Sequence, residues 1–128
     1  MKILILFIAT AFMLTEYQPL TTKLPIVIIK KDARKLAEYY RQSVLRGESM
    51  SSIAKLYSED PGSANNGGQY NNVVRGMMVP EFEKVAFSLL KPNDISEVFE
   101  TSYGFHFIQL ISRKNETLNL RHLLITKD

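Results

Sequence analysis

The sequence predicts an α+β domain in which an antiparallel sheet of about four strands is surrounded by helices. Three observations lead to this prediction. A short apolar run lies at residues 24–29, three segments with helical spacing follow it, and segments of strand character fill residues 95–126. The chain has 128 residues and an apolar share of 45%, which suits one domain with one core.

The first two predicted elements are a strand and a helix. Residues 24–29 are dense in β-branched side chains and predict a buried strand, which Pro25 suits only at its beginning. Asp32 can cap the helix that follows, and Gly47 can end it. The apolar residues of this helix recur every three or four positions; they are Ala33, Leu36, Ala37, Tyr40 and Val44.

Two more helices are expected on either side of a loop. The second helix starts near residue 51 or 52 and ends before Pro61, because proline cannot continue a helix. Its predicted buried residues are Ile53, Leu56 and Tyr57. Residues 62–72 are rich in Gly, Asn and Ser and predict a structured loop. The third helix begins near Pro80 and ends before Pro92, and its apolar face contains Phe82, Val85, Ala86 and Leu89.

The rest of the chain predicts strands. One strand is indicated by Ile95, Val98 and Phe99. Residues 102–104 make a tight turn, and residues 105–111 form a second strand with alternating faces, so that the two strands make a hairpin. Residues 118–126 are a further strand candidate after a polar turn at residues 114–117.

The composition argues against several classes of function. The net charge is only +3, and Lys and Arg are scattered among acidic residues, which argues against nucleic acid as a partner. The chain has no cysteine and only two histidines, His106 and His122, so it offers neither zinc-type spacing nor a disulfide framework. We therefore expect no metal and no cofactor.

The first residues carry information about the compartment. Met1 and Lys2 precede a largely apolar run at residues 3–14, and polar residues follow from Thr15, a pattern that resembles a secretory signal. The run is well short of the about 20 residues of a membrane-spanning helix, so no stable membrane span is expected. The alternative is a buried strand or helix at the start of the fold.

Five short blocks of sequence occur in a characteristic order and spacing. They are Tyr57-Ser58-Glu59-Asp60, Gly67-Gly68, Arg75-Gly76-Met77-Met78-Val79-Pro80-Glu81-Phe82, Ala86-Phe87-Ser88-Leu89 and Thr101-Ser102-Tyr103-Gly104-Phe105-His106. Together they resemble the parvulin family of peptidyl-prolyl isomerases, and most of all the SurA-like envelope foldases. The resemblance implies a parvulin-like domain at residues 24–113 behind a signal-like segment at residues 1–23. It also implies a location in the periplasm or cell envelope and assistance to the folding of exported proteins.

The resemblance also implies a site that binds unfolded or extended proline-containing polypeptides. Its catalytic residues would be Asp60, Thr101 and His106. Its apolar wall would contain Met78 and Phe82, completed by Tyr70 and Tyr103. Judged without the resemblance, Met78 and Phe82 fit an ordinary core better than a binding site, and His106 fits a core histidine bonded to a neighbour. Asp60 likewise fits a turn residue, and Thr101 a strand-edge hydroxyl bonded locally.

Two departures from the family pattern favour a second function. The strand at residues 24–29 lacks the Arg-His pair that the family places there. The family's Gly-Gly-Asp-Leu-Gly becomes Gly67-Gly68-Gln69-Tyr70-Asn71, which removes a carboxylate and a glycine. These departures motivate the alternative of a catalytically weak or inactive chaperone module that binds unfolded, proline-containing polypeptides.

The C-terminal segment contains the Arg-His-apolar pattern that the first strand lacks, at Arg121 and His122. Two explanations compete. In the one that we favour from sequence, residues 114–128 contain the start of a second parvulin domain of a tandem foldase. In the other, the segment folds back and pairs with the sheet, so that His122 takes the missing position near His106.

Overall fold

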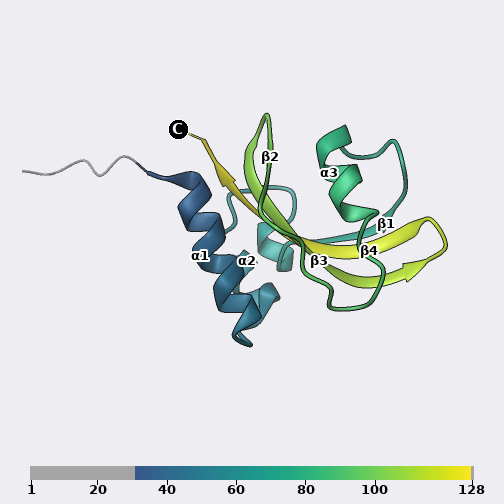
Figure 1. The fold of residues 1–128 in the computed structure, drawn as a ribbon, viewed down its shortest axis with the longest axis horizontal. Helices are drawn as coiled ribbons and strands as arrows, with labels where there is room; N and C mark the ends of the chain where they lie inside the picture. The colour runs from purple at the N-terminus through teal and green to yellow at the C-terminus, as the bar shows by residue number, and fades with distance from the viewer. Residues whose placement is uncertain (1–30, 128) are drawn as a thin grey trace, which may run out of the picture. The chain divides into compact units, whose positions relative to one another are not determined.

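The computed structural model describes residues 31–127, in which helices flank a four-stranded antiparallel sheet (Figure 1). The elements are α1 (Ala33–Leu45), α2 (Met50–Tyr57), the 3-10 helix η1 (Ala64–Asn66), β1 (Gln69–Val73), α3 (Pro80–Ala86), β2 (Phe99–Thr101), β3 (Gly104–Lys114) and β4 (Thr117–Thr126). The strand order is β1-β4-β3-β2. The predicted α+β class is therefore confirmed. The signal-like segment and the strand predicted at residues 24–29 lie outside the described residues.

Helix α1 forms as predicted. The Asp32 side chain accepts a hydrogen bond of 3.0 Å from the Lys35 backbone N–H, which satisfies one of the free donors at the helix start. Ala37 and Val44 are buried on the face that meets the sheet. Gly47 follows the helix with φ +106°, a left-handed conformation that glycine adopts without steric cost.

Helix α2 differs from the prediction in its start and in its buried face. Ser49 caps it, accepting a hydrogen bond of 3.2 Å from the Ser52 backbone N–H. Ile53 is buried, but the predictions for Leu56 and Tyr57 are wrong, because these side chains are 71% and 47% exposed. The helix has only 8 residues and buries one narrow face, which leaves its last turn at the surface.

Helix α3 is shorter than predicted. Pro80 begins it, and Phe82 and Ala86 are buried, but the helix ends at Ala86 rather than just before Pro92. The Leu89 N–H donates to the Ala86 carbonyl, three residues back, at 3.2 Å. This bond closes a narrower turn than the α-helical bond, which spans four residues. Leu89 is still buried in the core next to α3.

Strand β1 lies where a loop was predicted, because its Gly- and Asn-rich surroundings carry no strand signal. It pairs with β4 at Gln69↔Arg121 and Tyr70↔Leu120. Just before it, Gly68 has φ +75°, and a Cβ at this position would collide with the His122 carbonyl oxygen. Only glycine therefore allows the chain to approach β4 this closely.

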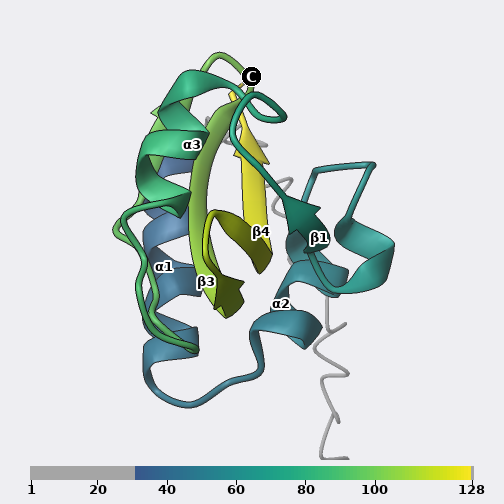
Figure 2. The same cartoon turned by 90° about the vertical axis from the view of Figure 1, so that its right-hand side faces the viewer.

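Strand β4 runs between β1 and β3, as Figure 2 shows. It pairs with β3 over most of its length, for example at Phe107↔Leu123 and Ile108↔His122. The C-terminal segment therefore folds back onto the sheet, as the second of the two explanations states. The reason is its burial, since Leu120 and Leu123 on opposite faces are both 0% exposed.

The two faces of the sheet carry two core clusters. One joins Ala37 of α1 to Phe107 and Leu123, and the other joins Phe82 of α3 to Ile108. Because successive residues of a strand point to opposite faces, α1 and α3 cover opposite faces of β3 and β4 (Figure 1). Among residues 31–127, no helix has the length and apolar character needed to cross a membrane.

Leu120→Ala tests the place of β4. Leu120 is 0% exposed, so the variant should lower the free energy of unfolding by about 2–5 kcal/mol, measured by urea denaturation. Leu90→Ala is the matched control, because Leu90 is 68% exposed and its loss should change the stability by at most about 0.5 kcal/mol. Equal stabilities of the two variants would show that β4 does not enter the core.

Candidate functional site

A cavity of about 460 Å³ lies between the chain after α2, the start of α3 and strands β1, β3 and β4. Most of its wall is apolar and is formed by Pro61, Tyr70, Met77, Met78, Val79, Phe82, Tyr103 and Leu124. Its polar groups belong to Glu59, Asp60, His106, His122 and Thr126. All of the sequence-predicted site residues except Thr101 line this cavity. Thr101 lies directly behind His106.

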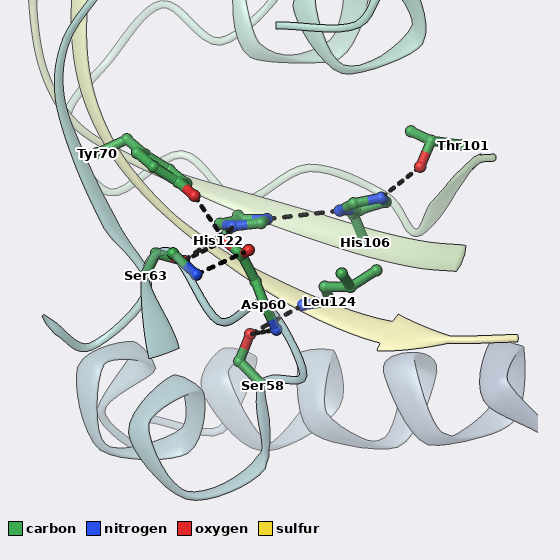
Figure 3. Close-up of polar contacts among 9 residues, drawn as sticks. Ser58, Asp60, Ser63, Tyr70, Thr101, His106, His122 and Leu124 are labelled. Carbon is green, nitrogen blue, oxygen red and sulfur yellow. Dashed lines mark hydrogen bonds and ion pairs between the residues drawn. The ribbon is translucent and has the colours of Figure 1, made fainter. Parts of the chain in front are cut away.

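The carboxylate of Asp60 is the centre of the polar part (Figure 3). Its Oδ2 accepts hydrogen bonds from His122 Nε2 at 2.7 Å, Ser63 Oγ at 2.6 Å and the Tyr70 hydroxyl at 2.7 Å. The hydrogen bond from His122, with those from Ser63 and Tyr70, holds the pKa of Asp60 well below its usual range, against the effect of burial. Asp60 is therefore an ionised acceptor at neutral pH.

Two buried histidines continue the network from Asp60 (Figure 3). Their rings stack with centroids 5.6 Å apart, and their Nδ1 atoms are separated by 3.4 Å. His106 Nε2 lies 2.6 Å from Thr101 Oγ1, which in turn accepts a hydrogen bond of 3.2 Å from the Tyr103 backbone N–H. Asp60, Thr101 and His106 are thus joined, with His122 between Asp60 and His106.

One arrangement of protons satisfies all of these contacts. Because Asp60 is ionised, His122 donates from Nε2, and in its neutral form it accepts at Nδ1 from the Nδ1–H of His106. His106 Nε2 is then free to accept from the Thr101 hydroxyl. Burial, followed by the charge of His122, lowers the pKa of His106 from its ordinary 6.5 to about 4, so this ring is neutral at pH 7.

The apolar and polar parts of the site meet at Phe82. Its ring stands edge-on to His106 and His122, with centroids 5.9 and 5.4 Å apart, and it is only 4% exposed. Phe82 is therefore both a core residue and part of the cavity wall, so the two roles considered from sequence coexist. Met78 is half-buried, whereas Tyr103 is 62% exposed at the rim of the cavity.

Sequence reasoning missed two contributions to this site. It overlooked Ser63, whose hydroxyl donates to Asp60 three residues earlier. The signal was available, because an aspartate in a turn often accepts hydrogen bonds from the residues that follow it. It placed Tyr70 in the wall but did not foresee the bond from its hydroxyl to Asp60. His122 entered only as the less favoured of two explanations, and the Arg-His-apolar pattern was its signal.

The arrangement suits non-covalent binding better than group transfer. The hydroxyls of Ser63, Thr101 and Thr126 are held by Asp60, His106 and Glu59, and the protein has no cysteine. Among residues 31–127, no cluster of three or more His, Asp or Glu side chains could hold a metal ion. The cavity can therefore accommodate an apolar ring of a ligand, placed beside the fixed dipoles of the protein's own polar network.

Comparisons with known proteins agree on one family. The family model for the PPIC-type PPIase domain matches residues 14–126. Foldase protein PrsA 4 of Bacillus cereus is 38% identical over 99 residues, which cover 77% of this chain and 34% of the relative. Chaperone SurA of Nitrosococcus oceani is 40% identical over 78 residues, which cover 61% of this chain and 18% of the relative.

A solved structure is also similar. The crystal structure of the peptidylprolyl isomerase PrsA from Bacillus cereus is 29% identical, covers 74% of this chain and 31% of its own, and has a TM-score of 0.48. The chain spans 34% and 18% of the lengths of the two curated relatives, and so corresponds to one part of each.

The buried His106 makes stability depend on pH. The unfolded chain binds a proton at His106 near pH 6.5, but the folded chain does so only near pH 4. Stability should therefore fall as the pH is lowered through this range, by up to about 3 kcal/mol, measured by urea denaturation. His106→Gln should reduce this pH dependence, and an unchanged slope in the variant would contradict the assignment.

Proposed function

The chain belongs to the family of PPIC-type peptidyl-prolyl isomerase domains, as its resemblance to the parvulins indicated, and we propose that it isomerises X-Pro peptide bonds in unfolded polypeptides. The observation that carries this proposal is the junction at Phe82. There an apolar wall able to hold a proline ring adjoins the network of His106, His122 and Asp60.

The physical task fits this junction. Rotation about an X-Pro amide crosses a barrier of about 18–20 kcal/mol, which falls when the amide loses its resonance. The reaction needs no covalent intermediate. Met78 and Phe82 remove the proline ring from water, and the fixed dipoles of the histidine network favour the twisted amide over either planar form. Because these dipoles are already bonded, they need little reorganisation during the rotation.

The position of His122 supports catalysis over binding alone. The absence of a histidine from residues 24–29 and the changed loop were the two reasons to expect a weak enzyme. In the structure His122 stacks on His106 at 5.6 Å, so a pair of site histidines is present after all. The changed loop at residues 69–71 remains a departure, and its Tyr70 bonds Asp60 directly.

A chaperone function without significant turnover is the second candidate. Its support is the exposed apolar rim of the cavity, where Met77 is 54% and Tyr103 is 62% exposed. Such a rim can hold an extended apolar chain whether or not its proline is isomerised. The two functions share one site and differ in turnover.

The names of the relatives also suggest where this chain works and what it binds, and we propose both on that basis. Both relatives are named as a foldase or a chaperone, and each is much longer than this chain. Together with the signal-like residues 1–23, these names support the proposal that the protein acts on exported polypeptides in the periplasm or cell envelope. Further domains of a tandem foldase are the corresponding partners in such an assembly.

A protease-coupled assay on an Ala-Xaa-Pro-Phe peptide tests the enzyme proposal. The protein should accelerate the cis-to-trans step, and Met78→Ala should lower kcat/KM about tenfold by shortening the cavity wall. Met78 is chosen because it is half-buried, whereas Phe82 also supports the core. Leu90→Ala, far more exposed, should leave kcat/KM unchanged. Turnover equal to that in buffer would exclude catalysis, and binding of an unfolded proline-rich client would then support the chaperone function.

The lining of the cavity predicts a preference at the residue before proline. Within the described chain the lining includes the carboxylates of Glu59 and Asp60 and no Lys or Arg, although Lys31 outside the lining pairs with Glu59 at 2.6 Å. Met77 and Tyr103 make the rim apolar. A substrate with Leu before Pro should therefore show a kcat/KM about tenfold above that of one with Glu. Met77→Lys should lower the ratio of the two kcat/KM values, because a cation at the rim attracts the Glu side chain of the second peptide. Equal rates for the two peptides in the unmodified protein would refute the preference.

A further inference from the structure

Tyr70 touches the site in two distinct ways. Its ring lines the cavity, with its centroid 5.4 Å from that of His122 and its plane tilted by 39°. Its hydroxyl donates to Asp60 Oδ2 at 2.7 Å, the same oxygen that His122 Nε2 contacts. A residue that served only as wall would need the ring alone.

The pairing of β1 with β4 explains how Tyr70 reaches both groups. Tyr70 lies opposite Leu120, so its side chain points to the same face as His122, two residues further along β4. The residue beside His122 on β1's side is Gly68, whose carbonyl accepts the His122 N–H at 2.9 Å. A Cβ at Gly68 would collide with the His122 carbonyl oxygen, so glycine at this position allows β1 to approach His122 closely.

The loop that carries Asp60 is built around the same hydroxyl. A Cβ at Gly62 would lie 2.6 Å from the Tyr70 hydroxyl oxygen, so the loop passes against it without spare room. Gly62 N–H and Ser63 Oγ–H occupy other positions around the Asp60 carboxylate, at 3.2 and 2.6 Å. The carboxylate is therefore held from the loop on one side and from β1 on the other.

The direction of the bond is also defined. Burial, and then the bond to Asp60, raises the pKa of Tyr70 to about 12, so the hydroxyl keeps its proton and acts as a donor at neutral pH. Without it, Asp60 Oδ2 would lose one of its three side-chain donors, and the carboxylate could rotate away from His122 Nε2. The tautomer of His122 depends on that contact, together with the contact of Nε2 with Ser63 Oγ at 3.0 Å.

We propose that Tyr70 is a positioning residue, whose hydroxyl holds the Asp60 carboxylate against His122 Nε2 while its ring walls the cavity. The effect on turnover rests on the proposed isomerase function, whereas the effect on His122 does not. The family pattern has leucine at this place in the loop, so the hydroxyl is an addition that this chain's own loop makes to the site.

Tyr70→Phe tests the proposal, since it removes the hydroxyl and keeps the ring. In the isomerase assay kcat should fall about tenfold while KM changes less than about twofold. In ¹⁵N NMR spectra of the imidazole groups, His122 should lose its single Nε2–H form and show a mixture of tautomers. Tyr39→Phe is the matched control, because Tyr39 is 61% exposed on α1 outside the cavity, and it should change neither readout.

A double-mutant cycle separates this role from a general structural one. In an Asp60→Asn background, Tyr70→Phe should cause little further loss of kcat, because the bond that it removes already lacks its charged acceptor. Additive losses would overturn the proposal, as would a raised KM with unchanged kcat or an unaltered His122 spectrum in Tyr70→Phe. If the unmodified protein shows no turnover, the isomerase function fails, and the His122 spectrum alone decides the role of Tyr70.

Discussion

The hydrogen bond between His122 Nε2 and Asp60 Oδ2, at 2.7 Å, joins the loop after α2 to the centre of the sheet. Two backbone contacts reinforce the junction, from Glu59 N–H to the Leu124 carbonyl at 2.8 Å and from Leu124 N–H to Ser58 Oγ at 3.2 Å. The cavity exists because this loop is fastened beside β4. The same bond determines which nitrogen of His122 carries hydrogen, and hence the direction of every contact as far as Thr101.

Stability and chemistry share residues at this site. Within residues 31–127, no buried side-chain nitrogen or oxygen lacks a hydrogen-bond partner, so the polar network does not carry the penalty of unpaired buried groups. Phe99 stacks on His106 at 5.2 Å, and Phe82 meets both histidines edge-on. These rings keep His106 dry and neutral while they complete the core and the cavity wall. A substitution of Phe82 or Phe99 is therefore expected to alter the hydration and the pKa of His106.

Local sequence signals predicted the elements with clear periodicity or capping. Asp32 and Gly47 framed α1 correctly, and residues 105–111 lie within β3. The signals failed where local character and tertiary place disagree. β1 was taken for a loop because glycines precede it and two of its five residues are asparagines, and it is a strand only through its pairing with β4. Leu56 and Tyr57 were expected to be buried, but α2 buries the face that contains Ile53 and Ala54, which leaves Leu56 and Tyr57 at the surface.

The sequence by itself determined the family and the candidates Asp60, Thr101, His106, Met78 and Phe82, because short blocks in a fixed order carry them. It determined the α+β class through the spacing of apolar residues in its helices and strands. Only the tertiary structure decided that His122 stands between Asp60 and His106, and that the Tyr70 hydroxyl reaches the same carboxylate. The physical reason is that periodicity reports the type and buried face of an element but not its neighbours in a sheet. Asp60 and His122 are separated by 62 residues, and only the insertion of β4 between β1 and β3 brings them together.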